Sequence, residues 1–372
     1  MDVRGRILHR GRIHSISACV FACMALMASV ATMGACSKSP TESPVSVTAD
    51  TLRLGIAYGG TLTWLSDEEL AATLNDALEM GVKWVRADLS WPEVQPDSPH
   101  EFNWERFDRV ADATRERGLA LLPIVTYTPP WARPAGCSTF MCAPVDAGQF
   151  ATFAGEAASR YPDITTWEIW NEPNTQGSWR PRPDSVAYAN ILKLTADSIR
   201  KSIRSAKILI GGLSITGGIT PQEFLTELVR SRATVGVDGV GLHPYTFPNL
   251  ASERGPWVSP GEDANTGLKS LRSIFTNAGM PELPVWITEY GAPTGGADSS
   301  DHVNETRQAE IAADAVKTAA ADDGVAALIW YSYQDTGADP SDPESYYGLR
   351  RADSSRKPAY EAFRQAIEES PR

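Results

Sequence analysis

The sequence has 372 residues, of which 34 are basic and 46 acidic, and its formal net charge is −12. This balance argues against nucleic acid or an anionic membrane surface as a partner, because both are themselves negatively charged. Hydrophobic residues make up 42% of the chain, which is enough for the core of one large domain. The composition therefore predicts a globular body that binds neutral or weakly charged ligands.

Residues 1–36 have the pattern of an export signal. Four arginines precede an apolar run over residues 16–33, which ends in Gly34-Ala35-Cys36. The pattern resembles a bacterial lipobox, in which the cysteine is lipidated and becomes the mature N-terminus. We therefore expect an exported protein, either a cell-surface lipoprotein or a secreted one, that contacts the membrane only through a lipid on Cys36. A membrane-spanning anchor is the alternative, because the apolar run approaches the required length.

Residues 37–50 are rich in Ser, Pro and Thr and have no apolar periodicity. Such a composition predicts a flexible tether. Residues 51–372 are then left for a single catalytic domain.

From residue 51 onward, strand-like and helix-like segments alternate along the chain. Strands are expected at residues 52–58, 82–89, 120–126, 165–170, 208–213, 239–245, 285–290 and 326–332. Helices are expected at residues 67–80, 105–117, 147–160, 185–204, 222–230, 267–278, 306–321 and 358–369. This alternation predicts an α/β fold, the (β/α)8 TIM barrel. An open doubly wound sheet is disfavoured, because Gly59-Gly60 is not continued into a glycine-rich phosphate loop.

Several loops that follow the expected strands are long and rich in Trp, Tyr, Pro and Gly. They cover residues 90–103, 128–145, 171–184, 244–265 and 334–346. In a TIM barrel these loops build the catalytic face, so aromatic residues there predict a groove for a hydroxylated ligand.

Only two of the five cysteines lie in the body of the chain, Cys137 and Cys142, and both belong to one of these loops. In an exported protein they are expected to form a local disulfide. Since no histidine or further cysteine lies nearby and only three histidines follow the signal, we expect no metal centre and no cofactor.

Two expected strands lead directly into glutamates. Glu172 lies in Asn171-Glu172-Pro173 after the fourth strand, and the proline stops that strand from continuing. Glu289 closes the seventh strand. Two carboxyl groups at strand ends are what a retaining glycosidase needs, whereas either glutamate alone could belong to a structural ion pair. Glu168 lies within its strand and is expected to be structural.

These residues resemble the retaining glycoside hydrolases of the large (β/α)8 clan that includes the cellulase-like families. The resemblance covers residues 54–333 and rests on Asn171-Glu172-Pro173, Glu289, Arg86, His243-Pro244-Tyr245 and Trp330. One departure is the lack of a histidine in residues 125–131, where cellulase-like enzymes usually have one. The pattern therefore leans towards the β-xylosidase and iduronidase-like family of the same clan.

The resemblance implies a role for each residue. Glu289 would be the nucleophile, kept ionised by Arg86 and Tyr245, and Glu172 would be the general acid and base. Asn171 would bind the sugar 2-hydroxyl, and His243 would orient Glu172 or contact the leaving group. Trp330, Trp131 and Tyr127 are expected to bind substrate.

The expected activity is hydrolysis of β-linked oligo- or polysaccharides by a monomeric enzyme. Two alternatives remain. A transglycosidase would use the same residues with a sugar hydroxyl in place of water, and a non-catalytic carbohydrate-binding lipoprotein could use the same scaffold.

Overall fold

The computed structural model describes residues 52–255, 257–259, 267–298, 300 and 302–370. The predicted export signal, the tether and Cys36 lie outside the described residues. Within the described ranges, no helix is both long enough and apolar enough to cross a membrane.

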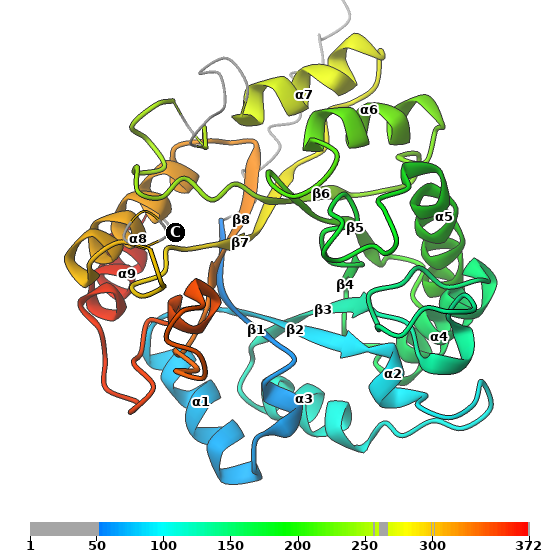
Figure 1. The fold of residues 1–372 in the computed structure, drawn as a ribbon, viewed down its shortest axis with the longest axis horizontal. Helices are drawn as coiled ribbons and strands as arrows, with labels where there is room; N and C mark the ends of the chain where they lie inside the picture. The colour runs from blue at the N-terminus through cyan, green and yellow to red at the C-terminus, as the bar shows by residue number, and fades with distance from the viewer. Residues whose placement is uncertain (1–51, 256, 260–266, 299, 301, 371–372) are drawn as a thin grey trace, which may run out of the picture. The chain divides into compact units, whose positions relative to one another are not determined.

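Eight parallel strands form a closed barrel, and each strand pairs with its neighbours in chain order (Figure 1). The strands are β1 (Arg53–Gly59), β2 (Trp84–Ser90), β3 (Ala120–Thr126), β4 (Thr166–Ile169), β5 (Lys207–Ser214), β6 (Gly239–His243), β7 (Val285–Tyr290) and β8 (Val325–Tyr331). The predicted (β/α)8 barrel is confirmed, and all eight predicted strands are present within two residues of their expected limits.

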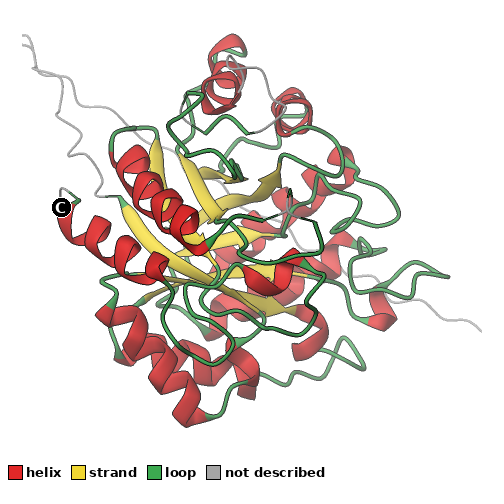
Figure 2. Cartoon of the chain, turned by 60° about the vertical axis from the view of Figure 1, so that its left-hand side comes forward, coloured by secondary structure: helices red, strands yellow, loops and turns green. Residues whose placement is uncertain are grey.

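Helices surround the strands on the outside, as the secondary-structure colours in Figure 2 show. The longer ones are α1 (Asp67–Glu79), α3 (Glu105–Glu116), α4 (Ala147–Arg160), α5 (Ser185–Ser202), α6 (Pro221–Arg230), α7 (Gly267–Asn277), α8 (Glu305–Ala320) and α9 (Pro358–Glu369). Not predicted were the short α2 (Trp91–Val94) and the 3-10 turns η1 (Leu62–Trp64), η2 (Pro130–Ala132) and η3 (Pro343–Tyr346).

Local signals fix where several of these helices begin. Ser66 and Glu69 form a reciprocal capping box at the start of α1, and Thr220 and Glu223 do the same at α6. Gly118, which follows α3, has a φ of +65°, a left-handed conformation that glycine adopts without steric cost.

Side chains alternate across each strand, so one set fills the barrel and the other packs under the helices. The interior set consists of Ala57, Leu122, Leu209, Trp286, Ala327 and Ile329, with Trp84 and Tyr331 packed against it. The larger apolar cluster lies between the strands and the helices. The barrel interior is therefore a packed core, in which the apolar layer meets a buried layer of polar side chains that includes Arg86 and Glu168.

Asp76 links the first and the last parts of the chain that form the barrel. This buried carboxylate on α1 accepts hydrogen bonds from Arg350 at 2.9 and 3.0 Å, from Arg356 at 3.0 Å and from Tyr360 at 2.9 Å. The donors lie in the segment after β8 and in α9. These contacts support the seam at which β1 pairs with β8.

Candidate active site

Arg86 is the central cation of the site. It points into the barrel from β2 and is 1% exposed. Its guanidinium donates to Glu168 at 2.7 and 3.1 Å, to Oε1 of Glu289 at 2.6 Å and to Oδ1 of Asn171 at 2.8 Å. Burial alone would lower the pKa of Arg86, but the two carboxylates outweigh it and raise that pKa. Arg86 is therefore a permanent positive charge that fixes three acceptors.

Glu168 lies inside its strand and is held by protein donors, as expected of a structural residue. It is fully buried on β4 and, besides Arg86, accepts hydrogen bonds from the backbone N–H of Gly212 at 2.8 Å and from the hydroxyl of Thr288 at 3.0 Å. Both oxygens are occupied by protein donors, so Glu168 holds Arg86 in position.

Glu289 ends β7 next to Arg86, and its side chain is 13% exposed. Oε2 accepts a hydrogen bond from the hydroxyl of Tyr245 at 2.9 Å. Burial would raise the pKa of Glu289, but the charges of His243 and Arg86 and the hydrogen bonds from Arg86 and Tyr245 lower it below its ordinary value. Glu289 is therefore an ionised carboxylate that stays partly exposed.

Glu172 follows β4 in a left-handed backbone conformation, with a φ of +46°. Its N–H donates to the carbonyl of Gly212 at 3.0 Å, and its Oε1 lies 3.0 Å from Nδ1 of His243. The left-handed region costs a non-glycine residue about 1–3 kcal/mol, and such strain gathers at functional sites. The strained turn aims the carboxyl group into the cavity, where its side chain is 23% exposed.

His243 connects the two glutamates. One carboxylate oxygen of Glu172, one of Glu289 and a ring nitrogen of His243 all lie within 4.8 Å of one another. Nδ1 of His243 is 3.5 Å from Oε2 of Glu289. These three ligand-type atoms could meet at a metal ion, but Arg86 already neutralises Glu289 and would repel a second cation, so we assign no metal here.

The tautomer of His243 follows from its other neighbour. Nε2 lies 3.1 Å from the hydroxyl of Thr288, which donates its single proton to Glu168. Since that hydroxyl can then only accept, Nε2 carries a proton, and His243 is a cation whenever Nδ1 also donates to Oε1 of Glu172.

A cavity of about 460 Å³ opens beside Glu172. It is lined by Glu172, Thr175, Gly177, Ser214, Ile215, Thr216, Gly217, Tyr245, Phe247, Glu344 and Tyr347. The lining combines hydroxyl groups with aromatic rings, the mixture that suits a sugar with polar edges and an apolar face.

Two of the three aromatic residues expected to bind substrate, Tyr127 and Trp131, lie in different positions relative to the cavity beside Glu172. Tyr127 is half-buried near the site and donates its hydroxyl to Asp88 at 3.1 Å. Trp131 is held by Trp91 and by a hydrogen bond to the carbonyl of Gln95, and it does not line the cavity beside Glu172.

The prediction for Trp330 is wrong. Its side chain is 0% exposed and packs against Phe363 of α9 and Tyr290, on the helix side of the barrel. Its neighbour Tyr331 points to the opposite side of β8, because side chains alternate along a strand. Tyr331 packs against the interior core and donates its hydroxyl hydrogen to Glu344.

Sequence reasoning missed Tyr331, Glu344, Tyr347 and Asp88. Burial raises the pKa of Asp88 to about 6, against the lowering effects of Arg86 and Tyr127. Asp88 could have been found, because it has the same strand phase as Arg86 on β2.

The predicted disulfide between Cys137 and Cys142 is present. It closes a loop whose Phe140 packs edge-on against Tyr127, with ring centroids 4.8 Å apart. The loop also bonds to the strand end through the N–H of Thr128 and the carbonyl of Phe140 at 3.0 Å. The disulfide therefore stiffens a part of the rim that contacts a site residue.

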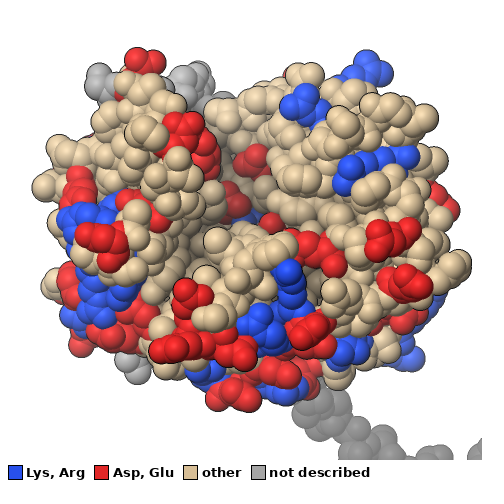
Figure 3. All heavy atoms as spheres, turned by 60° about the horizontal axis from the view of Figure 1, so that its bottom comes forward, with Lys and Arg blue, Asp and Glu red and all other residues tan. Residues whose placement is uncertain are grey.

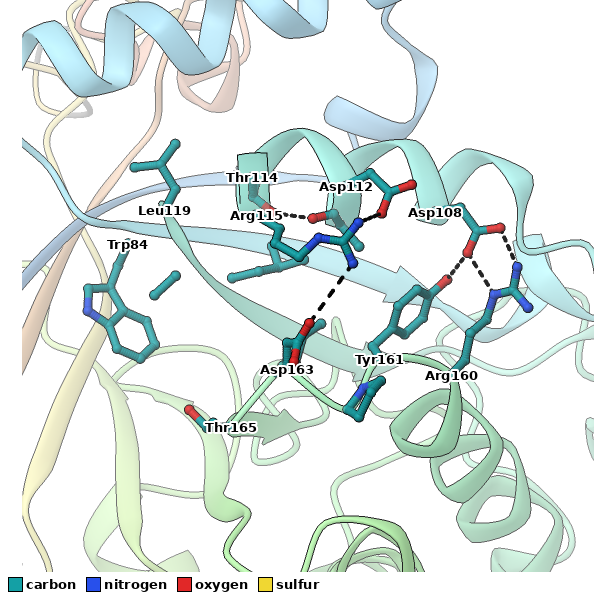
Figure 4. Close-up of a pocket in the computed structure, with 15 residues that line it drawn as sticks. Trp84, Asp108, Asp112, Thr114, Arg115, Leu119, Arg160, Tyr161, Asp163 and Thr165 are labelled. Atoms are coloured by element: carbon teal, nitrogen blue, oxygen red, sulfur yellow. Dashed lines mark hydrogen bonds and ion pairs between the residues drawn. The ribbon is translucent and has the colours of Figure 1, made fainter. Parts of the chain in front are cut away.

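A second cavity, of about 420 Å³, lies at the opposite ends of the strands (Figure 4). Its charged side chains pair with one another, Arg160 with Asp108 at 2.6 Å and Arg115 with Asp112 at 2.6 Å. In this fold the amino-terminal ends of the strands serve stability, and the paired charges agree with that role.

Comparison with known proteins decides the family. Residues 47–336 match the family described as Cellulase (glycosyl hydrolase family 5). The chain belongs to this family of glycosidases. The predicted clan is thereby confirmed.

The relatives found include members of a neighbouring family. A β-xylosidase of Geobacillus stearothermophilus is 25% identical over 217 residues, which cover 54% of this chain and 41% of that protein. The match thus spans about two-fifths of the curated relative.

Solved structures share the fold. A family 39 glycoside hydrolase from Bacteroides cellulosilyticus has a TM-score of 0.70 at 24% identity, covering 86% of this chain and 64% of that one. A monomeric β-xylosidase from Caulobacter crescentus has a TM-score of 0.65 at 20% identity, covering 84% and 67%. The GH5_18 protein of Streptomyces cattleya, solved with GlcNAc, has a TM-score of 0.63 at 19% identity, covering 86% and 81%.

Proposed function

We propose that this protein is a retaining glycosidase that hydrolyses β-linked glycosides with Glu289 as nucleophile and Glu172 as acid and base. The observation that carries the proposal is the approach of their carboxylate oxygens to within 4.8 Å. Retaining enzymes hold the two groups about 5–5.5 Å apart, whereas inverting enzymes need about 6.5–9.5 Å to admit a water molecule.

In the first step Glu289 attacks the anomeric carbon and the glycosidic bond breaks. The leaving oxygen takes the proton of Glu172, so the products are a glycosyl ester on Glu289 and a free alcohol. Arg86 and Tyr245 favour the ionised form of Glu289 before attack, which agrees with its lowered pKa.

In the second step Glu172 acts as the base. It takes a proton from water, the water oxygen bonds to the anomeric carbon, and Glu289 leaves as a carboxylate. His243 holds Oε1 of Glu172, which leaves Oε2 to face the glycosidic oxygen or the water. Asn171 has Oδ1 on Arg86, so its NH₂ group lies on the other side of the amide and can donate to the sugar 2-hydroxyl.

The substrate class follows from the cavity and the family. A space of about 460 Å³ with hydroxyl and aromatic lining has room for one or two sugar rings. The curated relative is named a β-xylosidase, which makes β-xylosides the first substrates to test. All of the proposed catalytic residues come from one chain, so a single subunit can carry out the reaction, and we propose that the enzyme is a monomer.

We also propose that the protein is exported, with residues 37–50 linking the barrel to a lipid on Cys36. The proposal rests on the order of the basic stretch, the apolar run and Gly34-Ala35-Cys36.

The test uses Glu289→Gln with 4-nitrophenyl β-glycosides and cell-wall β-glycans. We expect loss of turnover on every substrate that the wild type cleaves, because no other group can form the covalent intermediate. Glu68→Gln on the exposed face of α1 is the matched control and should keep wild-type rates. Near-native cleavage by Glu289→Gln would refute the assignment. Products longer than the substrate would identify a transglycosidase, and carbohydrate binding without cleavage by the wild type would identify a binding protein.

A further inference from the structure

Glu344 is a third carboxyl group in the candidate active site. It lies in η3, on the loop after β8, and lines the same cavity as Glu172 and Tyr245. Its side chain is exposed at the cavity rim, and Oε2 accepts a hydrogen bond from the hydroxyl of Tyr331 at 3.2 Å.

The position of Glu344 is fixed from several sides. Asp342 caps the turn by accepting from the N–H of Glu344 at 3.0 Å. Buried Lys357 donates to the carbonyl of Tyr346 at 3.1 Å and to Thr294 at 2.8 Å, and so ties the turn to the loop after β7. These hydrogen bonds fix the loop that carries Glu344. A residue that selects a ligand needs such a fixed position.

No cation compensates this carboxyl group among the residues that the structure describes. Arg86 is used by Glu168 and Glu289, and the ammonium of Lys357 pairs with Asp335 at 2.8 Å. Acidic side chains also line the central hollow of the face shown in Figure 3. A ligand in the cavity therefore meets the carboxyl groups of Glu172 and Glu344, with Glu289 within 4.8 Å of Glu172, and the arginine nearest to them, Arg86, is already paired.

We propose that Glu344 is a specificity-determining residue that accepts hydrogen bonds from sugar hydroxyls and excludes sugars that carry a carboxylate of their own. The proposal rests on the proposed glycosidase function and names its substrate class as neutral glycosides rather than uronides. Two carboxylates facing each other in a cavity from which the ligand has expelled water repel more strongly than they would in bulk solvent.

The ionisation of Glu344 adds a measurable signature. Although Glu344 is exposed at the rim, the cavity walls around it partly desolvate its carboxyl group and raise its pKa to about 7; the negative charges of Glu289, Asp342 and Glu172 act in the same direction, and the hydrogen bond from Tyr331 opposes them. Glu344 is neutral below this pH and charged above it. Exclusion of an anionic sugar should therefore strengthen as the pH rises through about 7.

The experiment compares wild type and Glu344→Gln, which keeps the size and an acceptor oxygen but removes the charge. The probes are 4-nitrophenyl β-D-xyloside, β-D-glucoside and β-D-glucuronide, measured by kcat/KM when cleaved and as competitive inhibitors otherwise. We expect the KM of the best neutral glycoside at pH 8.5 to rise about fivefold to tenfold, because a hydrogen bond to a carboxylate is replaced by a weaker one to a neutral amide oxygen. Binding of the glucuronide relative to the glucoside should improve about tenfold.

Three further measurements make the outcome decisive. The wild-type ratio of glucuronide to glucoside binding should fall between pH 5.5 and 8.5, and that of Glu344→Gln should stay flat. Tyr331→Phe should move the wild-type transition to higher pH, because the hydrogen bond that lowers the pKa of Glu344 is gone. Glu68→Gln removes the same charge as Glu344→Gln but far from the cavity. It should change neither the ratio of glucuronide to glucoside binding nor the pH dependence of that ratio.

A neutral-glycoside KM and a glucuronide ratio both within twofold of wild type in folded Glu344→Gln would overturn the proposal. If the wild type cleaves none of the three probes, calorimetric binding of the glucoside and the glucuronide to both proteins measures the selectivity, and hydrolysis is judged separately on the β-glycosides and cell-wall β-glycans named above.

Discussion

A Cβ atom at position 212 would lie 1.9 Å from Nε2 of His243. No contact of this length exists between real atoms, so only glycine fits where β5 passes this imidazole. The N–H of Gly212 also donates to Glu168, and its carbonyl accepts from Glu172. The close approach is therefore part of the geometry that holds the proposed catalytic pair.

Gly212→Ala should displace His243 and, with it, Oε1 of Glu172. We expect kcat/KM on an aryl glycoside to fall about 100-fold, the typical effect of a misplacement near 1 Å. Gly60→Ala is the control, because its added Cβ would meet only Asp88 at 3.7 Å, an ordinary contact. Equal kcat/KM for Gly212→Ala and wild type would show that His243 does not position Glu172.

Arg86→Lys should shift the acid limb of the pH profile of kcat/KM to higher pH. Lysine keeps the charge but cannot bond Glu168 and Glu289 at once, so the pKa of Glu289 should rise from its lowered value. Activity requires ionised Glu289, so it would be lost at a higher pH as the solution is acidified. An unchanged acid limb in the folded variant would mean that another group sets it.

Glu172→Ala should retain more activity on glycosides with good leaving groups than on those with poor ones, because good leaving groups need no proton. Added azide should restore turnover by attacking the glycosyl ester, and the product should be a β-glycosyl azide. Mass spectrometry and NMR of the product check this. Formation of that azide by a Glu289 variant instead would reverse the two roles.

Replacing Cys137 and Cys142 by serine should lower the unfolding temperature without unfolding the barrel. A disulfide across so short a loop stabilises by about 2 kcal/mol in the chain-entropy description. The KM should rise, because Phe140 would no longer hold Tyr127 firmly. Thermal unfolding with and without a reducing agent measures the effect, and reducing agent should change the wild type alone. Two free thiols in the folded wild type would contradict the pairing.

Cys36→Ser should release the protein from the membrane or stop its processing, while the barrel domain keeps its kcat/KM. Mass spectrometry of the mature N-terminus measures the modification directly. A diacylglyceryl group on Cys36 would support the anchor, and an unmodified N-terminus after cleavage nearby would point to free secretion.

The sequence predicted the barrel well because alternating strand-like and helix-like segments and long aromatic loops are local signals. It also singled out the proposed site residues, since Glu172 and Glu289 lie at the ends of short apolar strands and Arg86 is a lone cation within another. The roles of these residues stay predictions until they are tested in solution.

The choice between Trp330 and Tyr331 could not be made locally. Both are aromatic residues at the end of β8, and which one faces the cavity depends on the register of β8 against its neighbours. In β7, next to it, the pairing shifts between Ile287 and Tyr290. Glu344 was missed for a related reason, because it lies in an irregular loop and is brought to the site by contacts of Lys357 and Tyr331.

The bonds of Asp76 have a consequence for the order of events during synthesis. Its partners follow it by 274 to 284 residues, so the acceptor on α1 leaves the ribosome long before its donors do. A nascent chain can pack early strands and helices against one another, yet β8 and α9 must emerge before the ring closes. Until then the exposed edges of β1 and of the latest strand remain able to pair with other chains. The ring therefore cannot close until the last part of the chain is available, at whatever point of the proposed export route that occurs.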